Sequence, residues 1–191
     1  MSNGVRTEDR GRAKIIRFDR PEIRNPLSIG VLEFLSALIF GLDERVEKLI
    51  FTGSGKVFAS GADLREIAAV DVARARDFAL RGQGLMASIA ELEIPAIAAV
   101  NGICYGGALD LALACRHRIA SPEAEFCHPG AGLGIMTGWG GTQRLPRLIG
   151  EGAALEMFMT GKRVGADEAL KIGLIEKIED DPLAAAIDLC P

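Results

Sequence analysis

The stretch IPAIAAVNGICYGGALD, residues 94–110, decides the fold. Its apolar start after Pro95 is typical of a buried strand, and the glycines that follow lead into a helical pattern. A strand that enters a helix through glycines presents unpaired backbone N–H groups, backed by the positive end of the helix dipole. Asp110 follows Gly107 by three residues, which places its carboxylate about one helical turn from that amide. The stretch therefore predicts an anion-stabilising amide beside a carboxylate that could move protons.

Length and charge limit the functions that this chain can have. Its 191 residues show no change of composition along the chain, so we expect one domain, residues 1–191. A net charge of −4 with scattered Lys and Arg argues against nucleic-acid binding. The charged N-terminus lacks the apolar core of a secretory signal, and the apolar runs are too short to cross a bilayer. We therefore expect a cytoplasmic protein without membrane contact.

The cysteines and histidines do not have the spacing of a metal site. The four cysteines form no CxxC pair, and apolar surroundings favour buried, unreactive thiols for three of them. His117 and His128 would need two further ligands to hold a metal ion. The turn at residues 53–56 fails the phosphate-loop pattern, and no stretch matches the dinucleotide GxGxxG. We expect neither a metal nor a bound cofactor.

Periodicity elsewhere predicts short strands that alternate with helices. Strands are expected at residues 14–18, 49–52, 118–121 and 125–128. Helices are expected between Ser28 and Gly41, from about residue 64 to 91, and at 142–149, 153–159 and 166–172. The order strand, strand, helix recurs, so a stacked ββα arrangement fits better than a regular βαβ sheet.

Several segments, taken in order, resemble the crotonase family, also called the enoyl-CoA hydratase/isomerase family. They are residues 19–22 with Asn25, 52–64 with its Gly-Ala-Asp-Leu, 95–110, 120–126 and 138–150. The resemblance covers nearly the whole chain. It implies an α/β fold, a spiral of ββα units, and an acyl thioester of coenzyme A as the ligand. The family's C-terminal helices would be shortened here, and a homo-oligomer, a trimer or hexamer, is implied.

The resemblance also gives individual residues a role. The backbone amides of Ala62 and Gly107 match the family's oxyanion hole, where two N–H donors stabilise charge on a thioester oxygen. Gly-Ala-Asp-Leu alone would be more typical of a strand-to-helix turn capped by Asp63. Trp139 and Tyr105 could wall the acyl pocket or simply pack. The expected substrate-binding residues are Ala59, Gly61, Ala62, Asp63, Leu64, Tyr105, Gly106, Gly130 and Trp139.

Two positions depart from the hydratases of this family, which carry two glutamates. Asp110 stands at the first position, one methylene shorter, and Gly130 at the second. Adding water to a double bond needs a base for the water and an acid for the α-carbon, which one carboxylate serves poorly. His128 precedes Gly130 by two residues, so on a strand it would share its face, and imidazole titrates near neutral pH. We expect Asp110 and His128 as catalytic residues; a structural histidine and a solvent-exposed aspartate are the alternatives.

These residues predict an enzyme that stabilises a thioester enolate, through hydration or double-bond isomerisation of an enoyl-CoA. Gly130 leaves two other readings open. One is an acyl-CoA-binding member with little hydratase activity, and the other is a thioester hydrolase or decarboxylase on the same fold.

Overall fold

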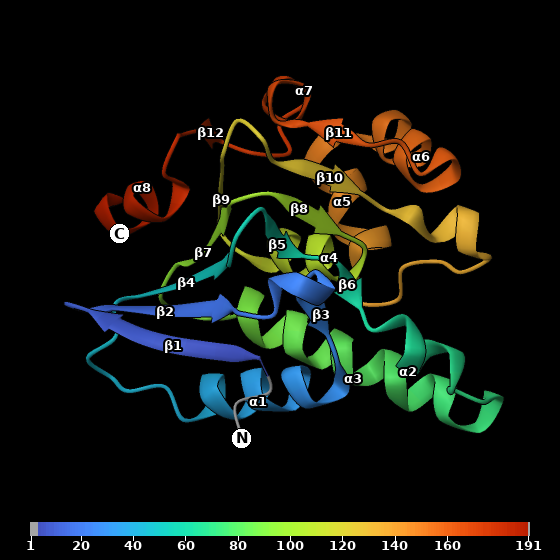
Figure 1. Ribbon diagram of the computed structural model, residues 1–191, viewed down its shortest axis with the longest axis horizontal. Helices are drawn as coiled ribbons and strands as arrows, with labels where there is room; N and C mark the ends of the chain where they lie inside the picture. Colours follow the sequence, from blue (N-terminus) through green and yellow to red (C-terminus); the bar gives the residue numbers. More distant parts are fainter. Residues whose placement is uncertain (1–3, 191) are drawn as a thin grey trace.

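The computed structural model describes residues 4–190, which form two stacked sheets and the helices around them (Figure 1). Within this range the larger sheet has the order β1 (Val5–Arg10), β2 (Ala13–Phe18), β4 (Lys48–Gly53), β7 (Ala96–Val100), β9 (His117–Ala120) and β12 (Lys177–Ile178). The smaller sheet has the order β11 (Val164–Gly165), β10 (Glu125–Cys127), β8 (Ile103–Tyr105) and β5 (Val57–Ala59). A separate short pair joins β3 (Pro26–Leu27) to β6 (Gly61–Ala62). The pairs are parallel, except β1 with β2 and β10 with β11.

The chain passes repeatedly from the larger sheet to the smaller one and then into a helix. β4 and β5 precede α2 (Leu64–Ala68) and α3 (Val72–Ala90), and β7 and β8 precede α4 (Gly107–Ala114). β9 and β10 precede the 3-10 turn η2 (Pro129–Leu133) and α5 (Gly141–Ile149). Successive turns stack so closely that a Cβ on Gly102 would lie only 2.0 Å from the carbonyl oxygen of Lys56, a position that suits glycine. The predicted spiral of ββα units is confirmed.

The helices agree with the expected positions, with one division. Ser28 caps α1 (Ile29–Phe40), and α6 (Glu151–Thr160) and α7 (Ala166–Lys171) lie where helices were expected. The long helix expected from about residue 64 to 91 is two helices. It divides because the Asp71 side chain accepts a hydrogen bond from the Arg74 amide, 2.9 Å, and so starts α3 anew.

The larger sheet separates two apolar clusters. Ile15, Ile50 and Ile97 are direct neighbours across β2, β4 and β7, and they face away from the main core. They are covered by α8 (Pro182–Asp188), a helix that we did not predict, whose start is capped by Asp181. The opposite face belongs to the main core together with the apolar residues of α1, α3 and α4. Figure 1 shows α1 and α3 below β1 and β2.

In the described part of the chain, no helix combines the length and the apolar character that crossing a bilayer requires. The helix that matters most for the site is α4, in which residues 108–114 are all buried. Asp110 is the charged residue in this apolar segment, and none of its surface is exposed. Burying a carboxylate carries a large free-energy cost unless it is compensated, so its position calls for an explanation.

Candidate active site

Two glycine-rich segments touch in front of α4. Gly106, with φ of 52°, turns the chain into the helix, and Gly61 on β6 has φ of 92°. A Cβ on Gly61 would lie 2.9 Å from the backbone nitrogen of Gly107 and 2.6 Å from the Tyr105 carbonyl oxygen. Only glycine permits both this backbone conformation and this approach. The contact brings Ala62, the next residue of β6, close to the start of α4.

A cavity of about 460 Å³ opens at this contact. Its wall contains Ala62, Gly107 and Asp110, together with His128 and Gly130 from the β10 side. Apolar side chains make up most of the remainder, among them Ile67, Val70, Phe78, Leu133, Met136 and Phe158. Among the described residues, no Lys or Arg lines it. Such a wall suits an uncharged, largely apolar group.

Asp110 is held through one of its two carboxylate oxygens. Oδ2 accepts hydrogen bonds from the Thr137 hydroxyl and from the Trp139 backbone N–H, the latter at 3.3 Å. Oδ1 has no hydrogen-bond partner among the described residues. Burial raises the pKa of Asp110 to about 6, because the two donors offset only part of the cost of desolvation. The carboxylate therefore exchanges its proton close to neutral pH.

His128 lies beside Asp110 at the end of β10. Its Nε2 is 3.7 Å from Asp110 Oδ1, and its ring packs on Phe158 with centroids 5.0 Å apart. Neither ring nitrogen has a hydrogen-bond partner within residues 4–190. Burial lowers the pKa of His128 to about 4. At neutral pH the pair therefore consists of an ionised aspartate and a neutral histidine, and both line the cavity.

Trp139 forms one wall, in a slot between α3 and α4. A Cβ on Gly82 would lie 2.1 Å from its ring, and a Cβ on Gly107 would lie 2.3 Å from it. The indole is buried against the two helices and also forms part of the cavity wall, so Trp139 both packs and lines the pocket. We did not identify Gly82 from the sequence, although a glycine inside a helix is unfavourable and is a signal of close packing.

Leu64 and Gly106 line the cavity as expected, whereas four of the predicted substrate-binding residues do not. Ala59 and Gly61 are buried next to it, and Asp63 caps α2 by accepting from the Arg65 amide at 3.0 Å. The expectation that Tyr105 walls the pocket is corrected. Its hydroxyl donates to Glu125 on β10, the strand that pairs with β8. The guanidinium carbon of Arg163 lies 6.0 Å from the centre of its ring. Strand β8 thus directs this side chain away from the cavity.

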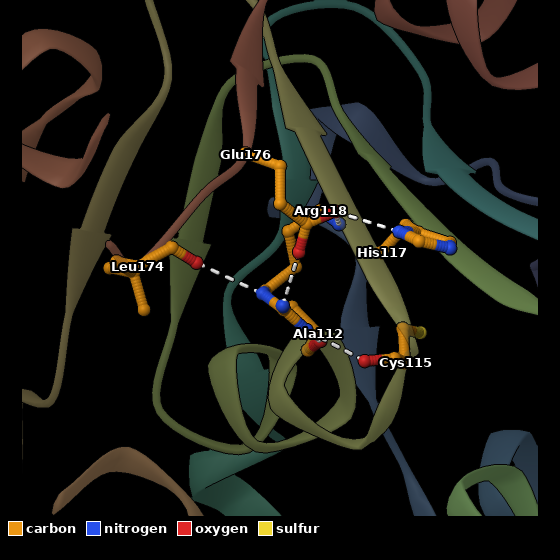
Figure 2. A network of polar contacts seen from close by, with 6 residues as sticks. All are labelled: Ala112, Cys115, His117, Arg118, Leu174 and Glu176. Atoms are coloured by element: carbon orange, nitrogen blue, oxygen red, sulfur yellow. Dashed lines mark hydrogen bonds and ion pairs between the residues drawn. The ribbon is translucent and has the colours of Figure 1, made fainter. Parts of the chain in front are cut away.

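The far end of α4 is fixed by a buried arginine, shown in Figure 2. Nη1 of Arg118 donates to the carbonyl oxygens of Cys115, 2.6 Å, and Ala112, 3.5 Å, and Nε donates to that of Leu174, 2.9 Å. Its guanidinium also pairs with Glu176. A cation at a helix C-terminus satisfies the last carbonyls and opposes their partial negative charge. This contact joins α4, which carries Gly107 and Asp110, to β9 and the segment before β12.

No three His, Cys, Asp or Glu side chains in residues 4–190 converge so that they could hold a metal ion. Three kinds of group at this site suit chemistry on a carbonyl compound. They are backbone N–H donors at the start of α4, a carboxylate with a near-neutral pKa, and a neutral imidazole. This combination suits the stabilisation of an oxyanion together with the transfer of a proton.

Comparison with curated proteins places this geometry among known relatives. The chain is 40% identical over 179 residues to the short-chain-enoyl-CoA hydratase of Clostridium acetobutylicum, covering 92% of this chain and 69% of that protein. It is 42% identical over 167 residues to the crotonyl-CoA hydratase of Syntrophomonas wolfei, covering 86% of this chain and 64% of that protein. The chain thus spans about two thirds of the length of these relatives.

Solved structures and a family model agree with these relatives. Pseudomonas aeruginosa DspI superposes with a TM-score of 0.93 at 38% identity, covering 97% of this chain and 78% of that one. The enoyl-CoA hydratase of Bacillus anthracis gives 0.89 at 35% identity, covering 97% and 73%. The family model described as enoyl-CoA hydratase/isomerase matches residues 10–186. The resemblance seen in the sequence is confirmed, and the chain belongs to the enoyl-CoA hydratase/isomerase family.

Proposed function

We propose that this protein binds an acyl thioester of coenzyme A and stabilises its enolate during the hydration or double-bond isomerisation of an enoyl-CoA. One observation carries the proposal: Ala62, Gly107 and Asp110, which come from two distant segments, line one apolar cavity. Relatives named as enoyl-CoA hydratases support the substrate class. That Ala59, Gly61 and Asp63 border the coenzyme A part of the ligand is proposed from the family resemblance alone.

The amides of Ala62 and Gly107 would donate to the thioester oxygen. Gly107 is the first residue of α4, where N–H groups have no partner inside the helix and the helix dipole is positive. Negative charge grows on the thioester oxygen as the enolate forms, so fixed donors stabilise the transition state more than the substrate. A donor of this kind contributes roughly 2.7 to 4 kcal/mol.

Asp110 would move the proton. In isomerisation its carboxylate takes a proton from one carbon, and the resulting acid returns the proton to another carbon of the same substrate. In hydration it takes a proton from water as the water oxygen bonds to the β-carbon and the double-bond electrons move toward the thioester oxygen. The Asp110 acid then gives that proton to the α-carbon. A pKa of about 6 lets one group serve in both directions near neutral pH.

His128 would hold the water in the hydration reaction. Its Nε2 and Asp110 Oδ1 are 3.7 Å apart, both lack hydrogen-bond partners among the described residues, and both residues line the cavity. A buried, unpartnered polar atom is costly, so each gains from contact with a polar ligand. In this proposal a neutral imidazole occupies the place left by Gly130, two residues away.

The cavity wall also bears on the acyl group. Asp110 is mostly ionised at neutral pH, and no lysine or arginine among the described residues lines the cavity to pair with a second anion. A carboxylate on the acyl group would meet repulsion here, which makes decarboxylation the less supported alternative. We propose an uncharged acyl chain as the substrate. By resemblance we also propose a cytoplasmic homo-oligomer that needs no cofactor beyond its coenzyme A substrate.

The deciding experiment is product analysis with a panel of enoyl-CoA and saturated acyl-CoA thioesters, beginning with crotonyl-CoA. Wild type and Asp110→Asn are compared, and we expect at least a hundredfold lower turnover in the variant, in line with the loss of a general base. Calorimetry with the same ligands measures binding separately. Binding without turnover by wild type would favour the acyl-CoA-binding alternative, release of free coenzyme A would favour thioester hydrolysis, and absence of binding would reject the acyl-CoA proposal.

A further inference from the structure

We propose that Thr137 and the backbone amide of Trp139 are positioning groups that hold Oδ2 of Asp110 and thereby reserve Oδ1 for proton transfer. This inference rests on the proposed function, because it concerns the same carboxylate. Both donors bind Oδ2, whereas Oδ1 has no hydrogen-bond partner among the described residues. Two donors on one oxygen fix the orientation of the carboxylate plane, so the second oxygen keeps one position relative to the cavity.

The loop that carries Thr137 is anchored independently of Asp110. Residues 134–140 join η2 to α5, with Gly134 and Gly140 in left-handed conformations at the two ends. The Gln83 side chain on α3 donates to the carbonyl oxygen of Gly138 at 2.8 Å, and the Trp139 ring fills the slot next to Gly82. Because α3 fixes this loop, the Thr137 hydroxyl is a rigid donor that acts on Asp110.

The side of Oδ1 is kept open by a glycine. A Cβ on Gly141 would lie 2.1 Å from Oδ1 of Asp110 and 3.1 Å from the Thr137 methyl group. Any larger residue at this position would therefore push the free oxygen away and press on its holder. His128 also approaches this oxygen, with Nε2 at 3.7 Å from Oδ1.

Several other groups act on Asp110, and they are unchanged by a substitution at Thr137. The Arg144 guanidinium and the Gly141 backbone amide lower its pKa, and His128 is a neutral neighbour. Cys104 on β8 also faces it, with a thiol whose pKa burial raises well above its usual range, so that thiol carries no charge. A change in the titration of Asp110 in Thr137 variants therefore reports the lost hydroxyl.

The test compares Thr137→Val, which keeps the shape but removes the donor, with Thr137→Ser, which keeps the hydroxyl. Carbon-13 NMR of aspartate-labelled protein follows the Asp110 carboxyl, assigned from the spectrum of Asp110→Asn. We expect its pKa to rise by about one unit in Thr137→Val, as loss of one charged hydrogen bond implies, and to stay near the wild-type value in Thr137→Ser. Thr160→Val, which removes an exposed hydroxyl bonded to the Glu156 carbonyl outside the cavity, is the matched control.

Kinetics with the enoyl-CoA that wild type converts gives the second readout. In Thr137→Val the acidic limb of kcat/KM against pH should move up with the pKa, and kcat on the plateau should fall about tenfold with little change in KM. Thr137→Ser should recover most of that loss. Thr137→Ala repeats both measurements without added bulk, should the valine variant not fold.

The outcomes separate this inference from the proposed function. An unchanged Asp110 pKa in both Thr137→Val and Thr137→Ala would overturn the hold on the carboxylate. A raised pKa with unchanged plateau kcat would overturn the role in proton transfer. A raised pKa in a protein whose wild type converts no acyl-CoA would leave the hold on Asp110 standing while the proposed function fails.

Discussion

Replacing Arg118 with methionine should test how the C-terminal end of α4 is stabilised. The variant keeps an unbranched side chain of similar length but removes the donors to the carbonyl oxygens of Cys115 and Leu174, at 2.6 and 2.9 Å. The bond to Ala112, at 3.5 Å, is too long to count for much. The ion pair with Glu176 also adds little, because that side chain is 43% exposed and regains water when it is lost.

The size of the effect follows from these contacts. A hydrogen bond from a charged donor contributes about 1.5 to 3 kcal/mol, so two such bonds contribute about 3 to 6 kcal/mol. Methionine returns about 1.5 to 3 kcal/mol by burying an apolar side chain in the same place. Pairing the low and the high ends of these ranges, we expect Arg118→Met to lower the free energy of unfolding by about 1.5 to 3 kcal/mol. That corresponds to a Tm lower by roughly 3 to 12 °C for a chain of this size.

Urea unfolding, followed by circular dichroism and by the fluorescence of Trp139, the single tryptophan, measures this loss. Arg45→Met is the control, because Arg45 pairs with Asp43 while its side chain is 88% exposed, and we expect a change below about 0.5 kcal/mol. A loss of less than about 1 kcal/mol in Arg118→Met, or an equal loss in both variants, would refute the idea that the buried arginine stabilises α4.

Three further predictions concern the cavity. In wild type, kcat/KM should decline below about pH 6 as the Asp110 carboxylate is protonated, and a rate that stays constant down to pH 5 would exclude it as the base. Gly141→Ala should lower turnover at least tenfold by displacing Asp110 Oδ1, from which its Cβ would lie 2.1 Å, whereas the fluorescence of Trp139 should change little. Stability should respond to pH through two opposed groups. The pKa of His128 is lowered from 6.5 to about 4, so its protonation destabilises the fold by about 3 kcal/mol as pH falls through that window. The pKa of Asp110 is raised from 3.8 to about 6, so its protonation stabilises the fold by about 3 kcal/mol as pH falls through its own window. Asp110→Asn should therefore lose about 3 kcal/mol more than wild type between pH 6.5 and 4 in urea unfolding, and parallel pH curves for the two proteins would contradict this.

Much of the order of strands and helices could be predicted because the signals are local, although β1 and β8 were not predicted as strands. The apolar run after Pro95 forms β7, and Ser28 caps α1, so each signal determines the structure of its immediate neighbours in the sequence. The helix α8 escaped because its apolar residues bury against Ile15, Ile50 and Ile97, which come from three distant strands. Its N-cap, Asp181 followed by Pro182, is a start signal that the sequence did contain.

Spacing alone could predict the site only within one segment. Gly107 and Asp110 share one helix, whereas Ala62 was placed beside them by the family resemblance. His128 and Gly130 also line the cavity, but they do not share a strand face as predicted, because β10 ends at Cys127 and Gly130 lies in η2. The contact between Thr137 and Asp110 could not be predicted, because it depends on a loop that a side chain of α3 holds next to α4. Tyr105 was misplaced because its hydroxyl donates to Glu125 on β10, and neither residue belongs to the cavity wall.

The incomplete hydrogen bonding of Asp110 has a physical consequence for the proposed chemistry. A third or fourth donor on the free oxygen would lower the pKa of the carboxyl further and make the buried charge less costly, but it would also make the group a weaker base. With no donor at all, the acid would stay protonated in this apolar helix, and its orientation would not be fixed. Two donors on Oδ2 lie between these limits, since they orient the group while burial still raises its pKa to about 6. The free energy that the fold forgoes at Oδ1 is, in our proposal, what leaves that oxygen able to bind the proton that the reaction moves.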